Sequence, residues 1–362
     1  MAESKLEKLL KNVNKGLEKA GITEKVTLGT DKVTEFISTG VPEFDLALGG
    51  GVAKGKVIHL YGQPSGGKSW LSLKIIAEAQ KKGLTCAFLD CEKSYDKSWA
   101  TKLGVVTDNL FYYPVSGAEI TMQAMRTLVE NEVDVVVLDS IAALVTKDEI
   151  DKTFDQEAKM AGTARLMSKA MRVLNSRGAG NVTMIFINQI RDNVGAFSPT
   201  GTTPITTPGG KAVKFYASQE INVKRGQDIK TGSGKDTVFE GYEMNILVDK
   251  NKVAPPKGRA SISVLKDGSF DIYEMVGNMA LRNDLFGPFE KNGNTYLLKG
   301  EKIAGKRDEF ISYLRTNQVA FEELKKSVLD NLFALKFDKF EEKTEDLNET
   351  DEKIIAEVEG NV

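Results

Sequence analysis

The octapeptide Gly62-Gln-Pro-Ser-Gly-Gly-Lys-Ser69 constrains this chain more than any other feature, because it fits the pattern G-x-x-x-x-G-K-[ST]. It follows an apolar run over residues 56–61 and precedes a helical pattern that begins at Trp70. In such loops, glycines let backbone amides converge on phosphate oxygens, the lysine reaches the β and γ phosphates, and the last hydroxyl binds Mg2+. The sequence therefore predicts a strand, a phosphate-binding loop and a helix around an ATP-type nucleotide. The residues expected to hold it are Gly62, Gln63, Pro64, Ser65, Gly66, Gly67, Lys68, Ser69 and Trp70.

Composition excludes several other classes of protein. The chain has 362 residues, 28% of them charged and 41% apolar, with a net charge of −2. It has no run of the roughly 18 or more apolar residues that a membrane helix needs, so we expect a soluble protein without membrane contact. His59 is the single histidine; we expect it in the core, which nearly excludes histidine-based catalysis. Two cysteines and no signal segment indicate a reducing cytoplasm, or a host cytoplasm if the protein is phage-encoded.

Short apolar runs alternate with helical patterns after the first strand, which predicts an α/β core with a largely parallel central sheet. Strands are expected at 56–61, 85–90, 110–113, 133–139 and 183–188, and helices after Ser69, near Trp99, and at 117–131 and 160–175. Strands at 218–225, 242–250 and 260–265 should extend the sheet in antiparallel fashion. The expected domains are an N-terminal helix with a linker (1–35), the core (36–272), a small C-terminal α/β lobe (273–337) and a disordered acidic tail (338–362).

Carboxylates end two of the predicted buried strands. Asp139 ends one and is positioned to hold Mg2+ together with Ser69. Glu92 follows another, where it would orient or deprotonate the water that attacks the γ phosphate, and Asp90 competes with it for this role. A solvated surface acid is the alternative for Glu92.

Two segments, both expected to be loops, suit contact with nucleic acid. The first, residues 147–160, precedes a helix whose cations Arg165, Lys169 and Arg172 share one face. The second, residues 190–210, carries four glycines, three prolines, Arg191 and the lone aromatic Phe197, which could stack on bases. A disordered linker and a solvated charged stripe are the alternatives. The N-terminal helix, with leucines at helical spacing, packs either on its own domain or on a neighbouring subunit.

With these motifs in place, the chain resembles the bacterial RecA recombinase family from near its N-terminus to about residue 335. The stretches that carry the resemblance include the phosphate loop, Ile37-Ser-Thr-Gly40, Val137-Leu-Asp-Ser140, Phe186-Ile-Asn-Gln-Ile-Arg191, Pro208-Gly-Gly210, Lys214-Phe-Tyr-Ala-Ser218, Lys250-Asn-Lys252 and Lys299-Gly-Glu-Lys-Ile303. The resemblance implies a DNA-dependent ATPase that forms helical filaments on single-stranded DNA and exchanges strands with homologous duplex. Single-strand-binding and mediator proteins are candidate partners, although the sequence itself is silent on accessory proteins.

Site roles follow from the same resemblance. Glu92 matches the catalytic glutamate, Gln189 the γ-phosphate sensor, and Lys68 the phosphate-binding lysine. Asp96 and Trp99 match contacts to the adenine, while Lys250 and Lys252 match lysines that reach the ATP of a neighbouring subunit. The residues that match DNA contacts are Arg165, Arg172, Arg191, Phe197, Gly209 and Gly210. The lobe would capture duplex DNA, and the tail would restrain access to it.

Some positions depart from the family pattern. The second segment diverges around Phe197, the first has Lys152 and Phe154 where the family has a glycine and an acid, and Lys211 adds a cation. These differences predict altered DNA affinity. A ring-type helicase with the same core is the alternative function, and a phosphotransferase with a small acceptor is a third, for which no acceptor motif is evident.

Overall fold

The computed structural model describes residues 4–22, 25–27, 35–152, 162–178, 180–192, 205–232 and 237–332. By its contacts the chain divides into two compact units, residues 1–35 and 36–362, and each is described by itself. Within the described ranges, no helix combines the length and apolarity that crossing a bilayer requires. The predicted acidic tail lies outside them.

The first unit holds the predicted N-terminal helix, α1 (Lys5–Lys19). Ser4 begins it through a capping box, in which its side chain accepts from the amide of Glu7 and the Glu7 carboxylate accepts from the amide of Ser4. The Asn14 side chain bonds both the amide and the carbonyl of Val26, at 2.7 and 2.9 Å, and so holds the following chain against the helix. Leucines of the apolar face, Leu6 and Leu9, remain exposed within this unit.

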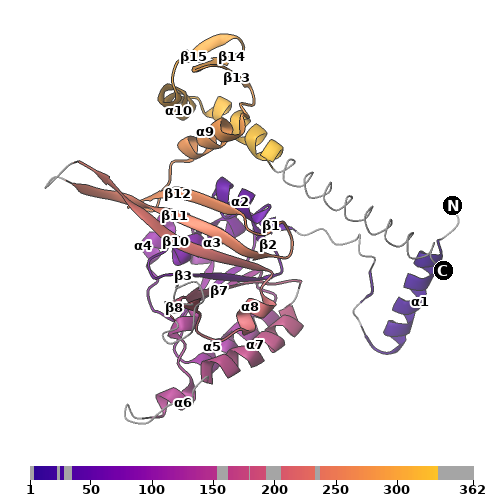
Figure 1. Cartoon of the computed structure of the whole chain (residues 1–362). Coiled ribbons are helices and arrows are strands. Elements are labelled where there is room, and N and C mark those ends of the chain that lie inside the picture. Colours follow the sequence, from indigo (N-terminus) through magenta and orange to yellow (C-terminus); the bar gives the residue numbers. More distant parts are fainter. Residues whose placement is uncertain are drawn as a thin grey trace, which may run out of the picture. The chain divides into compact units, whose positions relative to one another are not determined.

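An eight-stranded sheet forms the centre of the second unit (Figure 1). Its strand order is β12-β11-β10-β3-β7-β6-β4-β5, with β11 and β12 antiparallel at one edge and the other strands parallel. The strands are β3 (Val57–Gly62), β4 (Cys86–Asp90), β5 (Leu110–Pro114), β6 (Val135–Asp139), β7 (Thr183–Gln189), β10 (Gln219–Thr231), β11 (Val238–Asn251) and β12 (Arg259–Leu265). The predicted α/β fold with a largely parallel sheet is confirmed.

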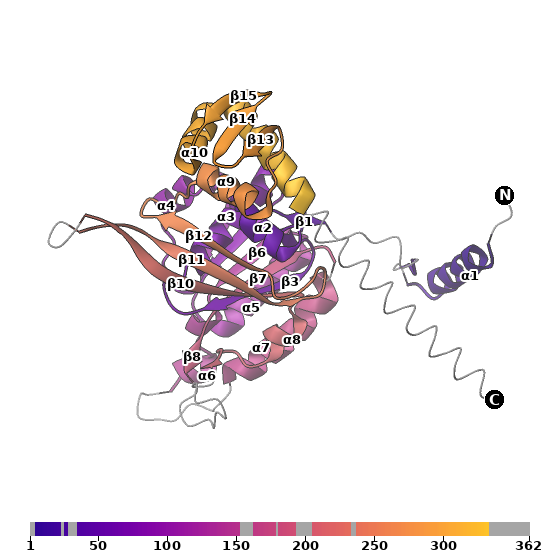
Figure 2. The ribbon, with the colours of Figure 1, turned by 45° about the horizontal axis from the view of Figure 1, so that its top comes forward.

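One strand differs from the expectation. We expected β10 to join the sheet antiparallel, but it pairs with β3 in parallel, residue Gln219 opposite Ile58. The reason is the short helix α8 (Ala212–Tyr216) between β7 and β10, which turns the connection into a crossover, and crossovers join parallel strands. Past β3 and β12, β10 and β11 continue as a two-stranded ribbon that projects from the sheet (Figures 1 and 2).

Helices cover both faces of the sheet (Figure 2). Alternate residues of β6 pack into two different cores: Val135 and Val137 lie with α3, while Val136 and Leu138 lie with α5 and α7. This explains why β6 is apolar on both faces from Val135 to Leu138. The remaining helices and short strands of this body are α2 (Pro42–Leu48), α3 (Lys68–Lys81), α4 (Lys97–Lys102), α5 (Ala118–Glu130), α6 (Lys147–Ile150), α7 (Gly162–Gly178), β1 (Phe36–Ile37), β2 (Val52–Ala53), β8 (Arg191–Asp192), β9 (Ile205–Thr206) and 3-10 turns at Thr107–Asn109 and Ile141–Ala143.

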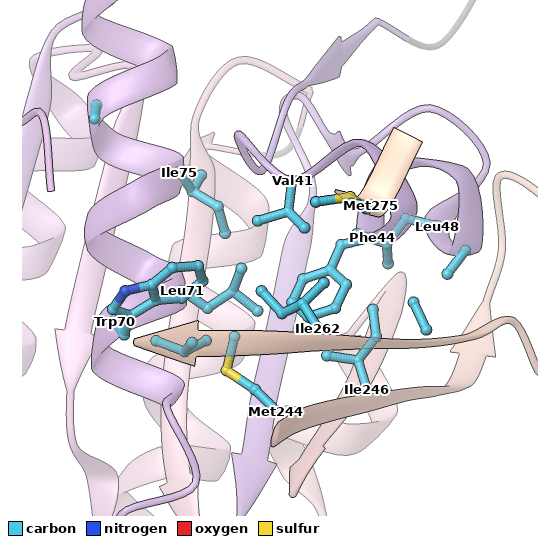
Figure 3. Close-up of a cluster of buried hydrophobic side chains, with 14 of the residues drawn as sticks. Val41, Phe44, Leu48, Trp70, Leu71, Ile75, Met244, Ile246, Ile262 and Met275 are labelled. Carbon is cyan, nitrogen blue, oxygen red and sulfur yellow. The ribbon is translucent and has the colours of Figure 1, made fainter. Parts of the chain in front are cut away.

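The core on the α3 side joins distant parts of the chain (Figure 3). Figure 3 shows Phe44 from α2 and Leu71 from α3 packed near Met244 of β11 and Ile262 of β12. Met275 of the helix α9 (Ile272–Asn283) enters the same cluster. Side chains from five elements therefore stabilise the sheet edge next to the phosphate loop.

A small lobe completes the second unit. After α9 it contains a three-stranded antiparallel sheet, β13 (Phe289–Asn292), β14 (Thr295–Leu298) and β15 (Glu301–Ala304), then α10 (Arg307–Thr316) and a helix over residues 318–332. Its buried residues, such as Phe310 and Phe321, belong to the core cluster that contains α3. An ion pair between Arg282 and Glu43, 2.8 Å apart, links α9 to α2.

Candidate functional site

The phosphate loop lies between β3 and α3, as predicted, and its glycines are required by close packing. A Cβ on Gly62 would lie 2.0 Å from the carbonyl oxygen of Val223 on β10. A Cβ on Gly67 would lie 2.3 Å from the sulfur of Met244 on β11, and Gly67 has a φ of +97°. The neighbouring strands β10 and β11 therefore leave no room for a side chain at these two positions. This is a second reason for glycine, besides the need to turn backbone amides toward phosphates.

Lys68 is held inside this loop. Its ammonium donates to the carbonyl oxygens of Gln63, at 2.7 Å, and Gly62, at 3.2 Å. Burial lowers its pKa, and the carboxylates of Asp139 and Glu92 oppose that shift. Both acids are thus close enough to act on the same cation.

The structure brings together the two predicted metal ligands. The Ser69 hydroxyl donates to Asp139 Oδ2 at 2.6 Å, across the ends of α3 and β6. Burial raises the pKa of Asp139 to about 6, while the bond from Ser69 lowers it and the nearby Glu92 raises it. A hydroxyl beside a buried carboxylate is a fitting donor pair for Mg2+, which takes oxygen ligands and keeps several waters. No cluster of three or more histidine, cysteine or acidic side chains suited to a metal occurs among the residues described.

Glu92 and Gln189 also meet. The Gln189 side-chain amide donates to Glu92 Oε1 at 3.0 Å, so the ends of β4 and β7 are joined at this point. The same oxygen accepts a bond from the Ser140 hydroxyl. Sequence reasoning assigned no role to Ser140, although its position directly after Asp139 at the end of β6 was a usable signal.

Asp90, the competitor of Glu92, faces the interior. It is fully buried, and its Oδ2 accepts from the amide of Tyr95 at 2.9 Å and the hydroxyl of Tyr112 at 3.2 Å. Glu92, by contrast, is exposed at the sheet edge. The geometry therefore favours Glu92 as the carboxylate that contacts a water or a phosphate.

Asp96 and Trp99, which are expected near the adenine, and Trp70, which is expected at the nucleotide, differ in their burial. Asp96 begins α4 by accepting from the amide of Trp99 at 2.6 Å, and Trp99 lies half-buried against Gly268. Trp70 is buried in the core and donates to the Gly268 carbonyl at 2.9 Å. Its side chain is therefore unavailable to a nucleotide, and only its backbone amide remains for that role. Gly268, absent from the sequence expectations, contacts both tryptophans.

Lys250 and Lys252 lie far from the phosphate loop of their own chain. Lys250 of β11 is opposite Glu220 of β10, and Glu220 is opposite His59 of β3. His59 precedes Gly62, the last residue of β3, by three residues, so Lys250 is level with a point about 10 Å along the strand from Gly62. The ammonium of Lys250 donates instead to the carbonyl oxygens of Lys214, at 2.8 Å, and Phe215, at 3.2 Å. The loop is at the carboxyl ends of the parallel strands. Both lysines lie toward the amino ends, where the amide of Lys252 donates to the carbonyl of Ser218, the residue before β10.

Part of the expected DNA surface is described. Arg165, Lys169 and Arg172 are all exposed on α7, which confirms that they share one face. The first segment, 147–160, was expected to be a loop, but residues 147–150 form α6 because Thr146 and Glu149 make a capping box. Lys152 pairs with Asp148 at 3.2 Å. Phe154 lies outside the described residues.

The ends of the second segment are tied together. Arg191, which is exposed, is opposite Thr206 in the β8–β9 pair. The Asn188 side chain donates to the carbonyl of Pro208 at 2.9 Å, directly beside Gln189. Gly209 is buried against Ile141, Gly210 and Lys211 are exposed, and Phe197 lies outside the described residues. Asn188 is a second residue that sequence reasoning passed over.

Comparison with known proteins agrees with this geometry. The family model described as the RecA N-terminal domain matches residues 4–270. The chain belongs to the RecA N-terminal domain family. This RecA match covers α1, the phosphate loop, Glu92, Asp139, Gln189, Lys250 of β11 and Lys252, which follows it.

Curated relatives of the RecA family extend over most of the chain. Protein RecA of Aquifex pyrophilus is 36% identical over 332 residues, which are 89% of this chain and 90% of that protein. Protein RecA of Legionella pneumophila (strain Corby) is 38% identical over 87% of this chain and 88% of its own length. The mitochondrial DNA repair protein recA homolog 3 of Arabidopsis thaliana is 39% identical over 82% of this chain and 68% of its own length.

Proposed function

We propose that this protein is an ATP-dependent DNA recombinase. It forms a helical filament on single-stranded DNA in the cytoplasm, pairs that strand with homologous duplex, and exchanges strands in recombination and repair. Membership of the RecA family supports this function, and one relative is named a DNA repair protein. The observation that carries it furthest is the pair of contacts at the end of β7: Gln189 bonds Glu92, and Asn188 bonds Pro208 at the end of the second DNA segment.

The chemistry of the site follows from the side chains that meet there. The amides of the loop and Lys68 would hold the phosphates of ATP, and Ser69 and Asp139 would hold Mg2+, which neutralises phosphate charge when bound. Glu92, kept in place by Ser140 and Gln189, would accept a hydrogen bond from the attacking water. The work is therefore positioning and electrostatic stabilisation rather than covalent chemistry. Trp99 and Asp96 would contact the adenine.

Each nucleotide site would be shared between two subunits. Lys250 and Lys252 lie toward the amino ends of the parallel strands, away from the loop, so they would serve the ATP of the next chain. The exposed leucines of α1 would pack on that neighbour as well. Assembly and hydrolysis are then coupled, because one chain lacks part of its own site.

DNA would bind along α7 and the second segment. Arg165, Arg172 and Arg191 would contact the DNA backbone together with the glycines 209 and 210, and Phe197 would stack on bases. We further propose that the lobe captures duplex DNA, that residues 338–362 restrain its access, and that single-strand-binding and mediator proteins assist loading.

The test combines three measurements on the full chain. We expect ATP hydrolysis to rise sharply with single-stranded DNA, long filaments to appear by electron microscopy, and homologous strands to be exchanged with ATP and Mg2+. Closed rings that unwind duplex DNA in one direction would instead favour the ring-type helicase and reject the recombinase.

The catalytic assignment has its own test. Glu92→Gln keeps the size of the side chain and removes its charge, so turnover should fall by roughly 100-fold or more while nucleotide-dependent DNA binding persists. Glu130→Gln, which removes a surface carboxylate of α5 that pairs with Arg126, is the matched control. Undiminished hydrolysis by Glu92→Gln would reject the role of Glu92.

A further inference from the structure

Three residues from three neighbouring strands form one row on the same face of the sheet. Glu220 of β10 is opposite His59 of β3 and, on its other side, opposite Lys250 of β11. Residues directly opposite one another point to the same face. Figure 1 shows these three strands side by side in the sheet. The row therefore connects the strand that ends in the phosphate loop with the lysine proposed to act on a neighbouring subunit.

Glu220 and His59 are a buried pair. Their exposed fractions are 3% and 2%, and His59 Nδ1 lies 3.2 Å from Glu220 Oε1. His59 Nε2 is buried and has no hydrogen-bond partner among the described residues. With its proton on Nδ1, the ring donates a hydrogen bond to Glu220 Oε1. Through this contact His59 orients the Glu220 carboxylate within the row.

The row forms one wall of a cavity of about 820 Å³. The opposite wall comes from α8 and the residue before it, Lys211, Lys214 and Phe215. Glu220 is the single acid among the described residues that line this cavity, and its Oε2 lies 4.0 Å from the ammonium of Lys214. Asp249, next to Lys250 on β11, is occupied by the hydroxyl of Tyr61 and by Lys257.

Charges around Lys250 act in opposite directions. Burial lowers its pKa below the ordinary value, nearby Lys252 and Lys214 also lower it, and the Glu220 carboxylate raises it. Its ammonium is held by the carbonyl oxygens of Lys214 and Phe215. Glu220 is thus the carboxylate that opposes these three influences on the pKa of Lys250, which stays below its ordinary value.

We propose that Glu220, oriented by His59, is a positioning residue that keeps Lys250 charged and in place for its role in the neighbouring nucleotide site. The inference rests on the proposed cross-subunit role of Lys250. It gives a function to the chain's single histidine, which composition alone placed simply in the core. Glu220 acts through Lys250 and contacts no substrate.

The first experiment needs neither nucleotide nor DNA. Competitive acetylation of the full chain with acetic anhydride, followed by mass spectrometry, gives the pH midpoint at which the Lys250 amine becomes reactive. In Glu220→Gln that midpoint should fall by about 0.5–1 pH unit, because a nearby opposite charge is lost. Glu243→Gln removes an exposed carboxylate from β11, the strand that carries Lys250. It should leave the midpoint unchanged. An unchanged midpoint in Glu220→Gln overturns the proposal.

The second experiment follows DNA-stimulated ATP hydrolysis against pH. In Glu220→Gln, the fall in kcat on the alkaline side should begin at lower pH, with the KM for ATP little changed. Adding Lys250→Arg should remove that shift, because a guanidinium stays charged throughout this range. An alkaline limb that is the same in Glu220→Gln and the wild type overturns the proposal. Should Glu220→Gln fail to fold by circular dichroism, His59→Phe tests the same pair and should give a smaller shift in the same direction.

The two hypotheses fail in different ways. Full DNA-stimulated hydrolysis by Lys250→Ala would reject the cross-subunit role itself. The acetylation midpoint would still report whether Glu220 controls the charge of Lys250.

Discussion

Glu92 owes its orientation to neighbours on two other strands. The Ser140 hydroxyl and the Gln189 amide both donate to Oε1 of Glu92, which leaves the second carboxylate oxygen for a water. Because Glu92 is exposed, without these bonds its side chain would sample several rotamers, and few of them would face the γ phosphate. Ser140, which was not predicted, and Gln189, which was, therefore determine how well the Glu92 side chain is ordered.

Ser140→Ala tests this dependence. We expect kcat for DNA-dependent ATP hydrolysis to fall about 10-fold with little change in the KM for ATP, because the lost bond orients Glu92 and contacts no nucleotide. Steady-state kinetics would measure it, with Ser312→Ala on the lobe helix α10 as the control. Wild-type kcat in Ser140→Ala would show that Gln189 alone is sufficient.

The buried carboxyl group of Asp45 should make the free energy of unfolding depend on pH. Burial raises its pKa to about 6, against the opposing bonds from Ser38 and Thr39. Because the folded state then binds more protons than the unfolded state, the free energy of unfolding should decrease as pH rises from about 4 to about 6. The contribution is about 1–2 kcal/mol after allowance for partial exposure.

Chemical denaturation at several pH values measures this effect. Asp45→Asn should make the decrease between pH 4 and 6 shallower, and the remaining slope belongs to Asp139, whose pKa burial also raises to about 6. Asp108→Asn, at an exposed carboxylate, should leave the slope unchanged. Parallel pH curves for the wild type and Asp45→Asn would exclude Asp45 as the source.

Among the elements, β10 and β11 determine the shape of the phosphate loop. Val223 and Met244 lie so close to Gly62 and Gly67 that no Cβ fits there. The strands that carry Glu220 and Lys250 also form the surface on which the loop rests. A change at the loop is therefore transmitted to these strands by direct packing.

Gly67→Ala separates packing from backbone strain when it is compared with Gly83→Ala. Both glycines have positive φ, but a Cβ on Gly83 would meet nothing within 4 Å. Gly83→Ala should cost about 1 kcal/mol of stability from strain alone.

Gly67→Ala should cost more stability and weaken ATP binding by roughly 100-fold. Thermal denaturation and nucleotide titration would measure the two effects. Adding Met244→Ala should recover part of that loss, with a coupling of about 1 kcal/mol; additive effects would contradict the packing argument.

Sequence reasoning identified strands such as Val135–Asp139 from their apolar runs. It identified Asp139 and Glu92 because they lie at the end of such a run or just after it. It missed the parallel entry of β10, since a five-residue helix between strands leaves little periodic signal. It also missed Ser140, Asn188 and Gly268, because their roles depend on side-chain direction and on contacts between distant segments. The position of Lys250 came from family resemblance and not from spacing, since no local pattern reports what a second chain supplies.

For the whole molecule, the proposed sharing of each site between two subunits predicts complementation between defective chains. Lys68→Ala and Lys250→Ala should each hydrolyse ATP poorly, but an equal mixture should recover roughly a quarter of the wild-type rate, because one interface in four joins two intact halves. DNA-stimulated ATPase assays of the mixtures measure it. Lys68→Ala mixed with Glu92→Gln should stay inactive, since both defects lie in the same half. No recovery in the first mixture would place Lys250 in the site of its own chain.

With the site shared as proposed, the separation of the phosphate loop from Lys250 and Lys252 would also give an assembly a direction. The two surfaces differ, so contact between them would be head to tail and a row of subunits would stay open at both ends. One end would present a loop without lysines and the other would present lysines without a loop. A row of n subunits would then have n − 1 complete sites, and the subunit at one end would hydrolyse its ATP slowly. Turnover per subunit should accordingly rise with the length of the DNA, and most steeply when the DNA is short.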